Sequence, residues 1–181
     1  MGKKITKQVK QFLAVVGLDL SLRESGVVVS TDKSDEFHER DIISRAEYIA
    51  ESILKLIEKT VKTSETLCII EGYGFAAKGR VFDLAEVGGI VKKTLTNSKC
   101  PYIVITPGQL KKYATGIGNA NKEQVRTGII MNWNTYIENN NVCDAYVLAR
   151  IGRAFIGQDV NLSNYQKDII KDLHKKYDSL L

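Results

Sequence analysis

Long apolar runs, histidines and paired cysteine motifs are what this 181-residue sequence has little of. No apolar stretch approaches the roughly 20 residues of a membrane-spanning helix, and none resembles a signal-peptide core. Two histidines, His38 and His174, are too few for histidine-based zinc chemistry. Cys68, Cys100 and Cys143 are widely separated and follow no zinc-ligand or redox spacing, which favours reduced structural thiols. We therefore expect a cytoplasmic protein with no membrane partner.

The size and composition of the chain predict one folded unit with a proper core. Its hydrophobic content is 44%, and no internal repeat, low-complexity segment or linker divides it. We expect a single domain over residues 1–181, with a basic N-terminal extension at 1–10 and a helical tail from about 160 to 181. The net charge of +5 and the pI of about 9.0 permit an anionic partner, although a solvated lysine surface gives the same balance.

The spacing of apolar residues predicts strands that alternate with helices. Runs at 11–18 and 25–30, separated by a turn, favour an antiparallel hairpin, and 36–43 supplies a weaker third strand. Two more strands are predicted at 66–70 and 102–105, and helices at 44–61, 81–95, 107 onward, 122–136 and 142–156. Right-handed crossovers then give an α/β fold, a mixed five-stranded sheet flanked by helices, in which the first and fourth strands are central neighbours. Trp133 is expected in the core.

Three acidic residues from distant parts of the chain carry the strongest functional signal. Asp19 closes the first apolar strand, Glu71 closes the fourth, and Asp144 opens an apolar helical stretch. A carboxylate at the end of a buried strand loses hydration and needs a partner or a metal. In this topology Asp19 and Glu71 meet at one sheet edge, and Asp144 can lean over it. Each alone could be a turn or capping residue, but together they predict a cluster that holds Mg²⁺ or Mn²⁺ for phosphoryl chemistry.

Basic residues occur near these acidic positions along the chain. They are Lys78, Arg80, Lys92, Lys93, Lys111, Lys112 and Lys122. An acidic site with basic surroundings suits a nuclease, because a metal cage needs cationic side chains to hold the phosphate backbone against it.

Several short motifs occur together in this sequence. They are Gly17-Leu18-Asp19, Ile69-Ile70-Glu71-Gly72-Tyr73, Gly88-Gly89, the run from Ile105 to Lys112, the glycine-rich loop from Thr115 to Asn121 that closes on Lys122, and Asp144-Ala145. Over roughly residues 12–156 the chain thereby resembles the RuvC-type Holliday-junction resolvases, most of all their phage-encoded branch. The resemblance implies an RNase H-like fold, a homodimer, and symmetrical nicking of four-way DNA junctions with Mg²⁺, for which Mn²⁺ is expected to substitute. The segment 81–95 resembles the family's dimer-forming helix, although a helix buried only within the monomer is the alternative.

The resemblance also implies roles for individual residues of the acidic site. Asp19, Glu71 and Asp144 match the family's metal ligands, and Asp19 is expected to bridge two cations because it ends the central strand. The fourth ligand, an acidic residue or a histidine one helical turn before the last aspartate, falls on Asn141. An asparagine can coordinate a hard cation but has no charge and cannot act as a base. Either metal affinity falls, or Glu138 helps from one turn further back.

Candidate DNA contacts follow from the same resemblance. Lys122, and more weakly Lys111, resemble phosphate-contacting lysines of the family. Tyr73 and Phe75 flank the position of an aromatic residue that stacks on a base of the opened junction in the family. Lys78, Arg80 and Lys112 are further candidates. The alternatives are ordinary surface lysines and aromatic rings that pin their loop to the core.

Other functions compete with junction resolution. The first is a broad branched-DNA endonuclease that cuts flaps, forks and Y-structures, and no residue decides between the two. The second is a catalytically weakened junction-binding protein, which Asn141 keeps open. A sugar kinase or actin-like ATPase, suggested by the turn after Gly17, is rejected because such proteins need two similar domains. We expect the protein in the cytoplasm, either of a bacterium or, as a phage protein, of its bacterial host.

Overall fold

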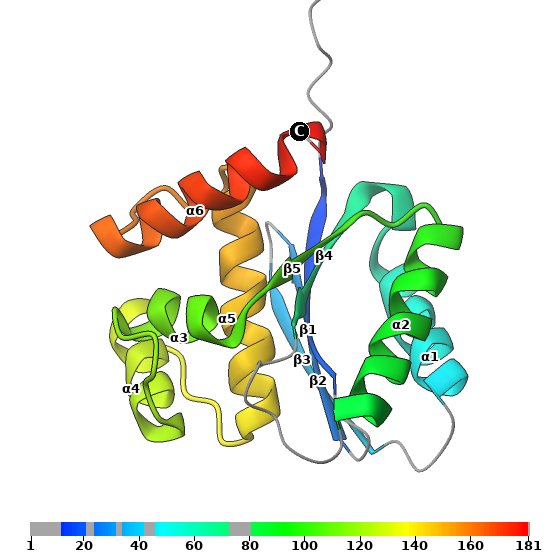
Figure 1. Ribbon diagram of the computed structural model, residues 1–181, viewed down its shortest axis with the longest axis horizontal. Helices are drawn as coiled ribbons and strands as arrows, with labels where there is room; N and C mark the ends of the chain where they lie inside the picture. Colours follow the sequence, from blue (N-terminus) through cyan, green and yellow to red (C-terminus); the bar gives the residue numbers. More distant parts are fainter. Residues whose placement is uncertain (1–11, 21–23, 32–33, 42–45, 73–80, 181) are drawn as a thin grey trace, which may run out of the picture.

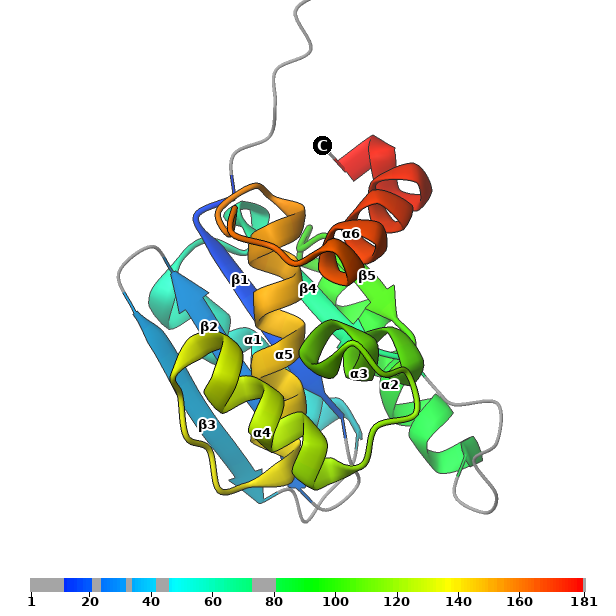
Figure 2. The same ribbon diagram turned by 90° about the vertical axis from the view of Figure 1, so that its left-hand side faces the viewer.

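A computed structural model describes residues 12–20, 24–31, 34–41, 46–72 and 81–180 of the chain. They form three layers, with a five-stranded sheet between two sets of helices (Figure 1). On one face lie α1 (Ala46–Thr60) and α2 (Val81–Asn97), and on the other lies α5 (Asn140–Phe155), with α3 (Pro107–Thr115), α4 (Lys122–Trp133) and α6 (Asn164–Tyr177) outside it (Figures 1 and 2). Short 3-10 helices occupy Thr63–Glu65 and Asp178–Leu180. None of the described helices has the length and apolar character needed to cross a membrane.

The sheet has the five strands expected from the sequence, with the expected hairpin and the expected central pair. Its strands are β1 (Ala14–Asp19), β2 (Glu24–Thr31), β3 (Asp35–Asp41), β4 (Thr66–Glu71) and β5 (Tyr102–Ile105). The spatial order is β3-β2-β1-β4-β5, so β1 is central. It pairs antiparallel with β2 and parallel with β4. The predicted mixed α/β sheet is therefore confirmed, and the carboxyl ends of β1 and β4 share one edge.

Three of the boundaries that differ from the prediction have identifiable reasons. The first strand begins at Ala14 and not at residue 11, because the chain bends at Leu13, whose N–H bonds to the carbonyl of Glu65 (2.9 Å), and pairing with β2 and β4 begins only at Ala14. Helix α4 ends at Trp133 because Asn134 adopts a left-handed conformation, with φ of 51°. Helix α5 begins two residues early because the Asn139 side chain caps it, accepting hydrogen bonds from the backbone N–H groups of the second and third residues of the helix.

Alternate residues of β1 face the two helical layers and help to form two cores. Val15 packs in the cluster around α5, whereas Val16 packs in the cluster under α1 and α2. Trp133 lies between aromatic rings of the first cluster, with its ring centroid 6.2 Å from that of Tyr113 and 5.7 Å from that of Tyr146. Trp133 is partly buried and packs against this core, which agrees with its expected place.

Helix α6 packs on α3 and α5, and its last residue reaches the outer edge of the sheet at β5. Its buried residues Ile169, Ile170 and Leu173 pack into the core around α5. At its end, the Tyr177 hydroxyl accepts a hydrogen bond from the N–H of Val104 (3.1 Å) and donates one to the carbonyl of Val104 (3.4 Å). Both outward-facing backbone groups of this β5 residue are therefore satisfied by a side chain of α6.

The packing of α5 on the sheet is unusually close because glycines face it. A Cβ atom added at Gly17 in β1 would lie 1.9 Å from the carbonyl oxygen of Ala145 and 2.7 Å from the backbone nitrogen of Ala149. One added at Gly26 in β2 would lie 2.1 Å from the carbonyl oxygen of Asn141. Any larger residue at either position would collide with backbone atoms, so the first half of α5 can reach this depth only over glycine.

The substitution Gly17→Ala should strongly destabilise the protein, because neither the β1 backbone nor the α5 backbone can yield locally. Overpacking of this kind costs about 1–3 kcal/mol or more. Urea unfolding would measure the loss. Gly108→Ala is the matched control, since a Cβ there lies 3.7 Å from the nearest atom, an ordinary contact. Equal stability of the two variants would contradict the close approach at Gly17.

Candidate active site

Three carboxyl groups meet at the edge of the sheet where β1 and β4 end. Asp19 is the last residue of β1, Glu71 is the last residue of β4, and Asp144 lies in the second turn of α5. One carboxylate oxygen from each residue lies within 4.8 Å of those of the other two. The structure thus brings together the three predicted acidic residues. Since Asn139 caps α5, Asp144 is free of the capping role that was its alternative explanation.

The environment of the cluster disfavours negative charge. Burial, followed by the charges of Glu71 and Asp144, raises the pKa of Asp19 to about 9. Burial and the charge of Asp144 raise the pKa of Glu71 to about 7, and burial raises the pKa of Asp144 to about 6. A hydrogen bond between the two carboxyl groups further raises the pKa of Asp19 and lowers that of Glu71. Without a cation, the three groups cannot all be ionised near neutral pH at low cost.

Two of the predicted lysines act on this cluster electrostatically. Lys122, the exposed first residue of α4, opposes the rise in the pKa of Asp19 and of Asp144. Lys111, half-buried on α3, opposes the rise in the pKa of Glu71 and of Asp144. Both ammonium groups therefore stand near the carboxylates. Lys112 follows on α3 and is exposed. The cluster has the predicted combination of an acidic centre with cationic neighbours.

The donor set fits a divalent cation. Within the described residues, this is the one group of three or more acidic, histidine or cysteine side chains close enough to share an ion. All three donors are carboxylate oxygens, which suit hard ions such as Mg²⁺, Mn²⁺ and Ca²⁺. Mutual repulsion that raises the pKa of the carboxyl groups is relieved when a cation binds among them. The cluster can therefore hold a divalent metal.

Asn141 lies on the first turn of α5, one helical turn before Asp144, so that both residues share a side of the helix. Its backbone N–H donates to the Asn139 side chain (2.8 Å), and its carbonyl oxygen packs against Gly26. Its side chain is half-buried. Glu138 is exposed, precedes the helix, and does not belong to the carboxylate cluster. Of these two residues, only Asn141 thus lies within α5 and on the same side of the helix as Asp144.

Four of the predicted DNA contacts cannot be placed. Tyr73, Phe75, Lys78 and Arg80 lie outside the described residues, between the end of β4 and the start of α2. Their assignment remains a prediction.

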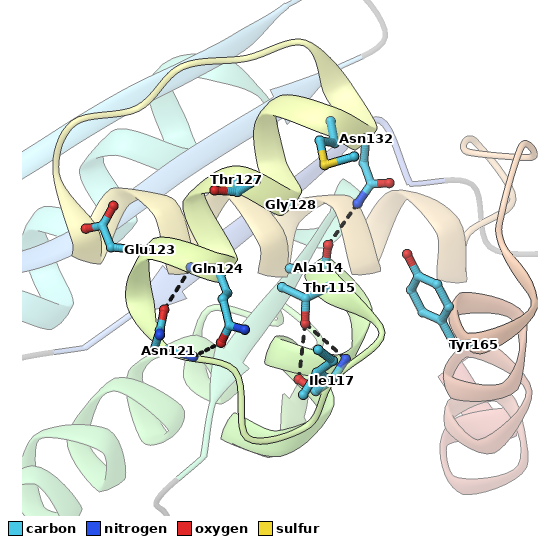
Figure 3. A pocket seen from close by; sticks show the side chains of 11 residues that line it. Ala114, Thr115, Ile117, Asn121, Glu123, Gln124, Thr127, Gly128, Asn132 and Tyr165 are labelled. Atoms are coloured by element: carbon cyan, nitrogen blue, oxygen red, sulfur yellow. Dashed lines mark hydrogen bonds between the residues drawn. The ribbon is translucent and has the colours of Figure 1, made fainter.

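A separate cavity of about 430 Å³ lies between α3, α4 and α6 (Figure 3). Met131 from α4 and Tyr165 from α6 help to line it, and none of the three clustered carboxylates does. One wall is the glycine-rich loop that leads to Lys122, where the Thr115 hydroxyl accepts a hydrogen bond from the N–H of Ile117 (3.0 Å). At the end of the loop, Asn121 caps α4 in a reciprocal capping box. The loop that delivers Lys122 is thus held by its own hydrogen bonds.

One residue near the site has no distinguishing pattern in the sequence. Arg126 of α4 bonds to the segment that precedes α5, and it also pairs with Glu123 at 2.9 Å. The spacing of Glu123 and Arg126 on one helix is the sequence signal that could have drawn attention to it. That spacing is common on helix surfaces, and the partners that distinguish Arg126 are mainly backbone carbonyls.

Comparisons with known proteins agree with this geometry. No curated protein matches the sequence. The solved structure of Thermus thermophilus RuvC matches with a TM-score of 0.60 and 16% identity, over 80% of this chain and 97% of that chain. T. thermophilus RuvC in complex with Holliday junction substrate matches with a TM-score of 0.61 and 15% identity, over 81% and 97% of the two chains. These similarities show an RNase H-like fold.

The sequence profile described as crossover junction endodeoxyribonuclease RuvC matches residues 13–151, which is more than half of the chain. The chain therefore belongs to the RuvC family of crossover junction endodeoxyribonucleases, as its motifs predicted.

Proposed function

We propose that this protein is a Mg²⁺-dependent endonuclease that resolves four-way DNA junctions by paired symmetrical nicks. The observation that carries the proposal is the cluster of Asp19, Glu71 and Asp144 at the sheet edge of a RuvC family member. A solved relative of the same fold is bound to a Holliday junction. We expect the enzyme to act in a bacterial cytoplasm, its own or that of a phage host.

The three carboxylates would hold Mg²⁺, and Mn²⁺ should substitute because it accepts the same oxygen ligands. The chemistry that Mg²⁺ supplies in such a site is activation of a water nucleophile and stabilisation of the leaving oxygen. Asp19 is the best candidate for a shared ligand, because it ends β1, the central strand of the sheet. Asn141 would add an uncharged oxygen from the preceding turn of α5. The carboxylates and Asn141 would thus bind and orient the metal, and Lys122 and Lys111 would hold the phosphate backbone of the DNA against the site.

A homodimer would place two such sites symmetrically about a two-fold axis, which matches the two-fold symmetry of a four-way junction. Helix α2 supports this arrangement because its two sides differ. Val87, Val91 and Leu95 are buried against the sheet and α1, whereas Ala85 and Gly89 are exposed on the opposite side. A small-residue surface of this kind allows the backbone of a second helix to approach closely.

A catalytically weakened junction-binding protein is the second candidate function. The specific observation in its favour is Asn141, which puts an uncharged amide where the family has an acidic residue or a histidine. The two candidates differ in Mg²⁺-dependent turnover.

Each of the changes Asp19→Asn, Glu71→Gln and Asp144→Asn should abolish junction cleavage and leave junction binding largely intact. Mutation of residues that only support metal ligands already lowers metal affinity or activity about 10–100-fold, so removal of a ligand itself should lower activity further. The measurement is cleavage of labelled four-way junction, flap and linear duplex in Mg²⁺ or EDTA, with binding followed in Ca²⁺. Cleavage at the wild-type rate by any variant would remove that residue from the ligand set. Tight binding by the wild type without cuts in Mg²⁺ or Mn²⁺ would establish the binding protein, and cleaved flaps would establish the broader endonuclease.

The change Asn141→Asp should tighten metal binding and raise activity at low Mg²⁺, because it adds a fourth carboxylate to the cluster. The metal concentration at half-maximal cleavage and the Mn²⁺ affinity by calorimetry would both report the effect. Glu138→Gln is the control, since Glu138 lies outside the cluster, and it should leave both quantities unchanged. If Asn141→Asp also changes neither quantity, position 141 does not contact the metal.

Stability without metal should fall as the pH rises. Since folding raises the pKa of Asp19 from 3.8 to about 9, the folded state keeps a proton that the unfolded chain has lost, and the free energy of unfolding decreases between these pH values. Asp19→Asn removes this dependence, so in EDTA the variant should be more stable than the wild type at pH 8, by a margin that shrinks toward pH 4. Urea unfolding at a series of pH values would test this, with the exposed Asp168→Asn as control. A margin independent of pH would contradict the linkage.

A further inference from the structure

The guanidinium group of Arg126 joins α4 to the start of α5. Its Nε donates to the carbonyl oxygen of Ile137 (3.2 Å), and its Nη2 donates to the carbonyl oxygen of Glu138 (2.8 Å) and to Oδ1 of Asn140 (2.9 Å). Its Nη1 donates to both carboxylate oxygens of Glu123, at 2.9 and 3.1 Å. The side chain is 21% exposed. All three guanidinium nitrogens are thus used at once, and in different directions.

These contacts connect the two sides of the carboxylate site. Lys122 lies one helical turn before Arg126, on the same side of α4, and its charge acts on Asp19 and Asp144. On the other side of the contact, the segment 137–140 leads directly into the first turns of α5, which carry Asp144. Arg126 therefore links, through its side chain, the turn of α4 that carries Lys122 to the start of α5, which leads to Asp144.

The segment that Arg126 holds has no regular secondary structure of its own. Residues 134–139 run between two helices and belong to no strand. The carbonyl groups of Ile137 and Glu138 therefore lack partners in a backbone ladder, and the guanidinium provides hydrogen bonds to both. A lysine at this position would keep the charge but would lack the planar fork that reaches several acceptors.

We propose that Arg126 is a positioning residue for DNA cleavage, which sets Lys122 and the Asp144 turn at their working separation. This inference rests on the proposed nuclease function. The sheet also holds the turn of α5 that carries Asp144, because the backbone at Asn141 and Ala145 packs over Gly26 and Gly17. Loss of the guanidinium should therefore shift Lys122 relative to this turn more than it disturbs the fold. A misplacement of about 1 Å can cost about 100-fold in rate.

The test compares Arg126→Lys with Arg153→Lys. Arg153 is a matched control, since its side chain is 16% exposed and bonds to Asp159, to the Ser30 hydroxyl and to the Thr31 carbonyl. It lies nine residues after Asp144 on α5, about 13 Å along the helix axis. Single-turnover cleavage rate, junction affinity in Ca²⁺, the Mg²⁺ concentration at half-maximal rate, and thermal stability would be measured for both variants and the wild type.

Arg126→Lys should lower the single-turnover rate at least about 10-fold and raise the Mg²⁺ requirement, with junction affinity within about two-fold of wild type. Arg153→Lys should lower thermal stability and keep the wild-type rate of the folded protein. If Arg126→Lys cleaves normally while Asp144→Asn is inactive, the nuclease function stands and the positioning role is wrong. A loss of rate that merely follows a loss of folded protein, as for a structural arginine, would also overturn it. If the wild type itself fails to cleave, the proposed function fails and the role of Arg126 fails with it.

Discussion

Helix α5 lies directly on the backbones of β1 and β2, because Gly17 and Gly26 put no side chain between them. Aspartate has a short side chain, so Asp144 reaches the carboxylates at the sheet edge only if its helix comes this close. The register places Gly26 opposite Asp19, and thus one of the glycines that admit the helix is the direct neighbour of a clustered carboxylate. The depth of α5 then fixes where its preceding segment and α4 must lie. The carboxylate cluster, the two lysines beside it and the hydrogen bonds of Arg126 all depend on this one contact between the helix and the sheet.

The cluster itself works against the stability of the fold. Burial and mutual repulsion raise the pKa of all three carboxyl groups, with Asp19 affected most. Lys111 and Lys122 offset part of this effect from outside the cluster, where they remain available to a phosphate. A divalent cation bound among the three groups would relieve this repulsion. Without it the cluster lowers the stability of the fold, a cost that functional sites commonly carry.

The sequence predicts the parts of the site that follow from periodicity and topology. Asp19 and Glu71 could be placed together because each ends an apolar run, and adjacent parallel strands end at one edge. Asp144 could be added because it opens an apolar helical stretch that can lean over this edge, and the resemblance to the RuvC family agreed with that placement. Arg126 could not be identified, because its acceptors are mostly backbone carbonyls, which every residue possesses. The early end of α4 was missed for a similar reason, since the left-handed conformation of Asn134 depends on the path of the following segment.

The contact of Tyr177 with the β5 edge bears on how a second strand could pair there. An open edge offers a row of backbone donors and acceptors that can pair with a strand of almost any sequence and in several registers. At Val104 the Tyr177 hydroxyl occupies both of these groups. A strand of another copy could therefore pair with Val104 only after the end of α6 had moved away, and in this way one phenol group protects that point of the edge.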